Sequence, residues 1–277
     1  METDNQAVQS LVNHISHAAF EAFGKRCIAV YLMGSLARGG FSELTSDIDV
    51  GIILCEELEN GDELKIHRII NESTREHASV HNKVSIFWGN VASINGDQDG
   101  GRYPPFDRLD LIEHALLIEG VEIRDQLIRP SQASLEIEGA KFAIDYLGNE
   151  ERMAEFFDCQ RIVEKGSVYV TKTVLFPARF IYLHRTNNIA GNDVSYQYFI
   201  EHFSGDACNL LAMAYQWRLG SVPESMALMV EQLQKGLVPL YLTFIDIYID
   251  VMGGHYGEES LVLKLKEWKS ILQNEVT

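Results

Sequence analysis

The chain has 277 residues and a formal net charge of −17, from 23 Lys and Arg against 40 Asp and Glu. Hydrophobic residues make up 46% of it, which is enough to build one large domain or two small ones and argues against disorder. A chain this acidic repels nucleic-acid phosphates at long range, so we do not expect DNA as a partner. Cationic small molecules or a basic protein fit the charge better, unless the acidity serves only solubility.

The N-terminal residues are polar and acidic, without the basic and apolar regions of a signal peptide. The longest apolar region, residues 237 to 252, is interrupted by Pro239, Asp246 and Asp250, so no membrane span is expected. None of the four cysteines forms a CxxC pair, and they fit free thiols in a reducing compartment. We therefore expect a cytoplasmic protein.

The first half of the chain mixes strand-like and helical patterns. The spacing of apolar residues predicts helices over residues 7 to 23, 63 to 79 and 107 to 119, strands over 27 to 33, 48 to 54 and 83 to 89, and a loop over 90 to 105. Strands and helices in this arrangement predict an α/β domain.

Helical periodicity dominates from about residue 134 onward. Helices are predicted over residues 137 to 147, 154 to 170, 174 to 184, 193 to 203, 207 to 218, 223 to 235, 240 to 252 and 258 to 274. The Arg129-Pro130-Ser131 stretch indicates a linker. The sequence therefore predicts an α/β domain over residues 1–128 and an all-α helical bundle over residues 129–277.

The residues that point to chemistry lie between the first two predicted strands. Gly34 lacks a side chain where backbone would approach a phosphate closely, and Ser35 supplies a hydroxyl and an N–H. Asp47 and Asp49 are two apart on a predicted strand, so both carboxylates project from one face. Two hard oxygen ligands suit Mg²⁺, which keeps its other positions for water and triphosphate oxygens. Asp-x-Asp alone indicates a solvated strand start and Gly-Ser alone a turn; their combination is much more specific.

Gly34-Ser35, eleven further residues and then Asp47-x-Asp49 entering an apolar strand resemble the polymerase-beta-type nucleotidyltransferase superfamily. The resemblance implies a mixed-sheet domain that transfers a nucleoside monophosphate from a nucleoside triphosphate to a hydroxyl, using Mg²⁺. It implies that Asp47 and Asp49 are the catalytic metal ligands. Gly34 and Ser35 would hold the triphosphate, with Ser46 nearby. Arg38 is a further nucleotide-binding candidate, with a surface ion pair as the alternative.

Within that superfamily, the layout resembles the streptomycin/spectinomycin-type aminoglycoside adenylyltransferases. These enzymes have a similar length and a helical second domain, and residues 174 to 194 are similar to a helix-turn-helix stretch in them. The resemblance implies transfer of AMP from ATP to a hydroxyl of an aminoglycoside-like small molecule, a cation that an acidic cleft would attract. Two alternatives stay open: a transferase acting on protein or RNA, as toxin–antitoxin members are, and a non-catalytic nucleotide-binding regulatory module.

One departure from the family concerns the third carboxylate, which family members usually have on the next strand. Residues 83 to 89, Lys-Val-Ser-Ile-Phe-Trp-Gly, contain no acid. That group often serves as a metal ligand or as the general base for the acceptor hydroxyl. Three explanations are open: two ligands suffice with one metal, the site binds nucleotide without transfer, or another carboxylate substitutes. The candidates for substitution are Asp97, Asp99, Asp107 and Glu113.

Overall fold

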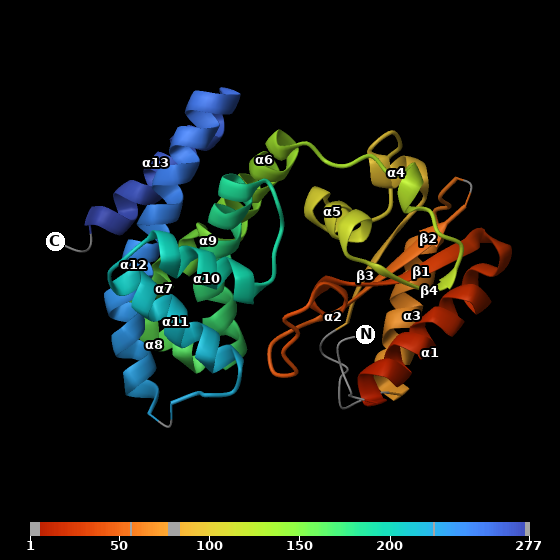
Figure 1. Cartoon of the computed structure of the whole chain (residues 1–277), viewed down its shortest axis with the longest axis horizontal. Coiled ribbons are helices and arrows are strands. Elements are labelled where there is room, and N and C mark those ends of the chain that lie inside the picture. Colours follow the sequence, from red (N-terminus) through yellow and green to blue (C-terminus); the bar gives the residue numbers. More distant parts are fainter. Residues whose placement is uncertain (1–5, 56, 77–83, 224, 275–277) are drawn as a thin grey trace. The chain divides into compact units, whose positions relative to one another are not determined.

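The computed structural model describes residues 6–55, 57–76, 84–223 and 225–274 (Figure 1). The contacts between residues divide the chain into two units: the first extends to Pro130, without the segment Ser42–Thr45, and the second consists of that segment and the chain from Ser131 onward. The first unit contains a mixed sheet with helices and the second is helical, which confirms the predicted fold class. The domain limit expected at residue 128 stays a prediction.

The first unit is built on a four-stranded sheet in the order β3-β2-β1-β4 (Figure 1). Strand β1 (Cys27–Met33) pairs antiparallel with β2 (Ile48–Leu54) on one side and with β4 (Leu116–Gly120) on the other. Strand β3 (Val84–Gly89) runs parallel to β2. The sheet is therefore mixed, as the resemblance implied.

The side chains of β2 alternate between the two faces of the sheet and so pack into two different hydrophobic clusters. Ile48, Val50 and Ile52 belong to a buried cluster with residues of α1 (Gln6–Phe23) and α3 (Asp62–Glu76). Side chains alternate between the two faces of a strand, so the Asp49 side chain projects from the opposite face, which is also the face on which Gly51 lacks a side chain. A second cluster on that face includes Ile94 of α4 (Val91–Asn95) and Leu111 of α5 (Pro105–Glu113).

The sequence-based assignment was wrong in two places in this unit. The helix predicted over residues 107 to 119 ends at Glu113, and Leu116–Gly120 forms strand β4 instead. The stretch predicted as a loop contains the short helix α4, which Asn90 caps by accepting a hydrogen bond from the Ser93 N–H at 2.7 Å. Both segments take their structure from local capping or from pairing with β1, neither of which apolar spacing reveals.

The second unit consists of helices and two π-helical turns. They are α6 (Gln132–Phe142), the turn Ala143–Leu147, α7 (Glu150–Phe157), α8 (Cys159–Glu164), α9 (Ser167–Thr186), α10 (Asn192–His202), α11 (Asp206–Arg218), α12 (Met226–Asp250), the turn Val251–Tyr256 and α13 (Glu259–Asn274). Helix α9 packs against α10, α11 and α12, and α12 also packs against α11 and α13. The segment Ser42–Thr45 belongs to this unit, where Ser42 Oγ donates to the Arg218 carbonyl at 2.8 Å.

Two long helices continue through prolines. Pro177 was expected inside a helix over residues 174 to 184, but α9 already begins at Ser167, and α12 joins the two helices that were predicted on either side of Pro239. Pro177 lies within α9 and Pro239 within α12. A proline inside a helix removes one N–H and normally leaves the carbonyl four residues earlier without its donor. At Pro177 that carbonyl belongs to Thr173, and the buried Tyr241 hydroxyl donates to it at 2.8 Å. Packing between α9 and α12 thus supplies the hydrogen bond that the proline removes.

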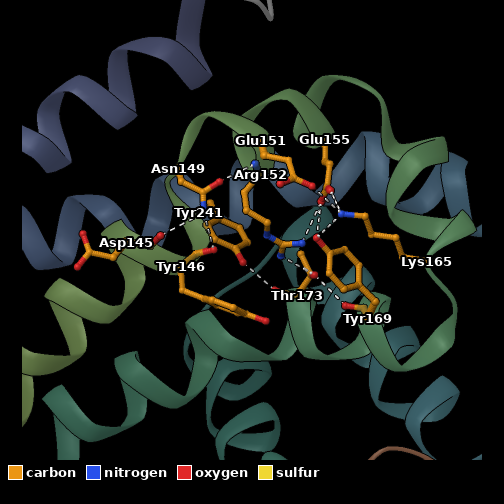
Figure 2. Close-up of polar contacts among 10 residues, drawn as sticks. All are labelled: Asp145, Tyr146, Asn149, Glu151, Arg152, Glu155, Lys165, Tyr169, Thr173 and Tyr241. Atoms are coloured by element: carbon orange, nitrogen blue, oxygen red, sulfur yellow. Dashed lines mark hydrogen bonds and ion pairs between the residues drawn. The ribbon is translucent and has the colours of Figure 1, made fainter.

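A polar network is built into the helical unit around Glu155, whose side chain is fully buried (Figure 2). Its two oxygens accept from Lys165 Nζ at 2.5 Å and from Arg152 Nη1 at 2.9 Å. Tyr169 donates to the same carboxylate at 2.8 Å, and Arg152 reaches on to Thr173 Oγ1 at 2.8 Å. Because these donors satisfy both carboxylate oxygens, we interpret the network as structural.

One helical stretch among the described residues, Met226–Tyr256, is long and apolar enough to cross a membrane by length and composition. Half of its most apolar window is buried within the unit, as in the core helix of a globular protein, so this is weak evidence for a span.

All four cysteines are free, and burial raises the pKa of the Cys27 thiol to about 12.

Candidate functional site

The turn after β1 brings two of the predicted site residues together. Gly34 begins the short helix α2 (Gly34–Arg38), and its neighbour Met33 is paired with Asp49 across the β1–β2 ladder. Gly34 has a φ of 65°, in the left-handed region, and a Cβ there would collide with the Asp49 carboxylate. Residue 34 therefore has to be glycine on two counts: its backbone conformation and the close approach of Asp49.

The other predicted residues lie along the same segment of chain. Ser35 is the second residue of α2 and is half-buried. Ser46 is buried, and Asp47 is half-buried and precedes the first residue of β2. Asp49 alone of the two acids lies within the strand, also half-buried. The β2 strand thus fixes Asp49, while Asp47 lies at the end of the incoming loop.

Helix α5 contributes an acid that the sequence analysis did not select. Asp110 is only 5% exposed, and its Oδ2 accepts the Gly34 N–H at 2.6 Å. Its Oδ1 accepts a short hydrogen bond from Arg38 Nη1, which completes a buried ion pair. Arg38 therefore forms an ion pair in the structure, as the alternative from the sequence had it, but the pair is buried and not on the surface. A single Asp inside an amphipathic helix, 76 residues after its partner, gives no local sequence signal.

The pairing of β2 with β3 shows what lies where the family usually has a third carboxylate. Asp49 is in register with Ser85, and the acid that accepts the Gly34 N–H is Asp110 of α5. Of the four substitutes named from the sequence, Glu113 accepts a hydrogen bond from Arg129 Nε at 2.9 Å. Lys83 lies outside the described residues. The strand itself therefore offers a hydroxyl and no acid beside Asp49.

Tyr103 is a second residue that sequence reasoning missed. Its hydroxyl donates to Met33 Sδ at 3.6 Å and fills the space above Gly51, where a Cβ would collide with it. Burial raises the pKa of Tyr103 well above its ordinary value, and the charges of Asp107 and Asp110 add to that shift, so the hydroxyl stays protonated. The glycine within an otherwise apolar strand was the available signal, because such a glycine often marks a close approach.

The donor set fits Mg²⁺ better than a metal held by protein ligands alone. Among the residues that the structure describes, there is no group of three or more His, Cys, Asp or Glu that could hold a metal ion. Asp47 and Asp49 offer hard oxygen atoms, and Mg²⁺ commonly takes one or two carboxylates with triphosphate oxygens and water. The two acids could therefore hold the ion together with a bound nucleotide.

Part of the chain is similar to a known domain family. Residues 19–94, which include the Gly34 turn and both aspartates, match the model of the nucleotidyltransferase domain family. The fold is similar to that of the spectinomycin adenyltransferase AAD(9) from Enterococcus faecialis, whose crystal structure contains ATP and spectinomycin. The similarity has a TM-score of 0.55 at 14% sequence identity and covers 82% of this chain and 97% of that one. No curated protein matches the chain by sequence.

Proposed function

We propose that the protein is a Mg²⁺-dependent adenylyltransferase, which transfers AMP from ATP to a hydroxyl of a small cationic molecule in the cytoplasm. The observation that supports this most strongly is the contact between the Gly34 turn and Asp49. A phosphate-binding turn and a metal-binding carboxylate must be neighbours for a metal ion to bridge them through the triphosphate. The family match over residues 19–94 supports nucleotidyl transfer as the reaction.

Each side chain then has a definite role. Asp47 and Asp49 would hold Mg²⁺, which supplies charge stabilisation to the transferring phosphoryl group. Ser35 would bind the triphosphate through its hydroxyl and N–H, and Ser46 lies one residue before the acids. The Gly34 N–H is occupied by Asp110, so Ser35 is the principal phosphate contact on the turn.

The acceptor class follows from charge and from the structural relative. A net charge of −17 attracts cations and disfavours RNA. The relative binds spectinomycin together with ATP. A hydroxyl-bearing cation of the aminoglycoside type is therefore the acceptor that we propose.

The test is incubation of the protein with each of the four α-³²P-labelled ribonucleoside triphosphates, Mg²⁺ and a panel of hydroxylated acceptors. The panel contains cationic aminoglycosides, neutral sugars of similar size, a protein mixture and RNA. We expect label to move from ATP to the cationic compounds, with release of pyrophosphate and with no transfer in excess EDTA. Transfer to protein or RNA alone would contradict the proposed acceptor, while leaving nucleotidyl transfer intact.

A second candidate function rests on Ser85, since β3 supplies a hydroxyl beside Asp49 where the family usually has an acid. That arrangement is also what a nucleotide-binding regulatory module would show. Binding of Mg²⁺ and ATP without pyrophosphate release for any acceptor in the panel would favour this function over transfer.

A further inference from the structure

Asp110 makes two contacts with the nucleotide-binding turn and uses a different oxygen for each. Oδ2 accepts the Gly34 N–H at 2.6 Å, and Oδ1 accepts from Arg38 Nη1. Both partners belong to α2, so one carboxylate holds the first and last residues of that helix. The side chains of Asp110 and Arg38 are 6% and 13% exposed. Hydrogen bonds in which a partner is charged are shorter and about twice as strong as neutral ones.

The position of Asp110 is fixed by packing on both sides of it. Its neighbours Leu109 and Leu111 are fully buried, and α5 packs against β1 and α2. A carboxylate buried without partners would be very unfavourable, so the contacts with Gly34 and Arg38 compensate the burial of Asp110. Movement of the turn would break both contacts at once.

This anchoring determines where the turn lies relative to Asp49. The Gly34 N–H donates to Asp110, and the Asp49 carboxylate occupies the space that a side chain at residue 34 would need. Both acids therefore contact the same glycine. Both Asp110 oxygens accept hydrogen bonds from α2, and Asp49 is the second residue of β2, where the metal is expected.

We propose that Asp110 is a positioning residue for nucleotidyl transfer, which anchors Gly34 and Arg38 so that the turn presents the triphosphate to the metal at Asp49. This proposal rests on the proposed function. In this proposal the third carboxylate of the site comes from helix α5 and not from β3. It positions the turn and does not bind the metal. Small misplacements of reacting groups lower turnover strongly while leaving binding nearly unchanged, and this is how its loss will show.

The test compares the wild type with Asp110→Asn and with the double variant Arg38→Gln/Asp110→Asn. The double variant removes both charges of the buried pair together and so avoids leaving one of them unpaired. Glu119→Gln is the control, because Glu119 on β4 accepts a hydrogen bond from Ser16 at 2.7 Å and does not contact the turn. Circular dichroism and thermal unfolding first establish the folded fraction of each protein.

Three quantities are then measured: the Kd for ATP with Mg²⁺, kcat per folded molecule with the acceptor that the labelling experiment selects, and the NMR exchange rate of the Gly34 amide. We expect both Asp110 variants to keep the Kd within about threefold and to lose kcat by about tenfold to a hundredfold. The Gly34 amide should exchange faster in both variants. The control should match the wild type in all three.

Wild-type kcat in folded Asp110→Asn would overturn the proposal, as would unchanged exchange at Gly34. A fall in activity that only follows the folded fraction would also overturn it, because that outcome assigns Asp110 a purely structural role. Failure of the proposed function would give a different result, because the wild type itself would then neither bind ATP with Mg²⁺ nor release pyrophosphate. In that case the exchange measurement still decides whether Asp110 anchors the turn.

Discussion

The carboxylate of Asp49 occupies the space that a side chain at residue 34 would need. The contact arises because the β1–β2 ladder places Met33 opposite Asp49, and the chain turns immediately afterwards with a positive φ at Gly34. The spacing between Gly34-Ser35 and the aspartates thus has a physical reason. The loop must be long enough for β2 to return beside β1 and bring Asp49 back to the glycine.

Gly34→Ala should therefore lower both stability and nucleotide affinity. A left-handed conformation costs a non-glycine residue about 1–2 kcal/mol, and the new methyl group would also displace Asp49. Gly24→Ala is the matched control, because Gly24 has a φ of 55° and a methyl group added there would meet no atom within 4 Å. Urea unfolding and titration with ATP and Mg²⁺ measure the two effects. Equal behaviour of the two variants in both assays would contradict the Asp49 contact.

Tyr241→Phe should destabilise the helical unit by about 1–3 kcal/mol, since it leaves the buried Thr173 carbonyl without a donor. Pro177→Ala restores a backbone N–H four residues after Thr173. In the Pro177→Ala background, the same tyrosine substitution should then cost less than about 0.5 kcal/mol. Denaturant unfolding of the four proteins in this double-mutant cycle gives the coupling. An identical tyrosine effect in both backgrounds would show that the hydroxyl does not replace the missing bond.

Glu155→Gln should destabilise the helical unit by about 3 kcal/mol, because Arg152 then keeps a buried charge without its partner. Glu151→Gln is the control, since Glu151 contacts the same Lys165 but its side chain is 70% exposed. The control should change the unfolding free energy by less than about 1 kcal/mol, as exposed pairs do. Chemical denaturation measures both, and similar losses for the two variants would rule out a special role for the buried acid.

Glu122 should contribute to the loss of stability in acid. Hydrogen bonds from Arg124 lower the pKa of Glu122 from 4.5 to about 2, with a smaller contribution from the Tyr31 hydroxyl at 2.9 Å. A folded pKa below the unfolded one means that its stabilisation is complete above pH 4.5 and disappears as the pH falls toward 2. Glu122→Gln should therefore reduce the slope of unfolding free energy against pH in that window. An unchanged slope would show that the Arg124 contact does not persist in solution.

Local patterns in the sequence predicted the three strands β1, β2 and β3 and most helices, because each has a regular apolar repeat. Strand β4 was mistaken for the end of a helix, since Leu116 and Leu117 also fit helical spacing and only pairing with β1 makes them a strand. Pro239 suggested a break in α12, but burial of the helix on both sides of it outweighs the local penalty of about 3 kcal/mol.

The residues of the candidate site also fall into those that the sequence could predict and those that it could not. Gly34, Ser35, Asp47 and Asp49 could be named from the sequence because their spacing within one hairpin reflects their geometry. Asp110 and Tyr103 could not be assigned in this way, because they contact Gly34 and Met33 from positions 76 and 70 residues further along the chain. Contacts of that range are set by tertiary packing, so no local motif records them.

The central claim is that Asp47 and Asp49 hold the metal and with it the triphosphate. The most direct measurement is transfer of label from α-³²P-ATP to an acceptor with Mg²⁺, for the wild type, Asp47→Asn and Asp49→Asn, each shown to be folded. Loss of a metal ligand removes several kcal/mol of transition-state stabilisation, so we predict a fall of at least about a thousandfold in kcat/KM for each variant. Transfer at the wild-type rate in both folded variants would contradict the two-aspartate site.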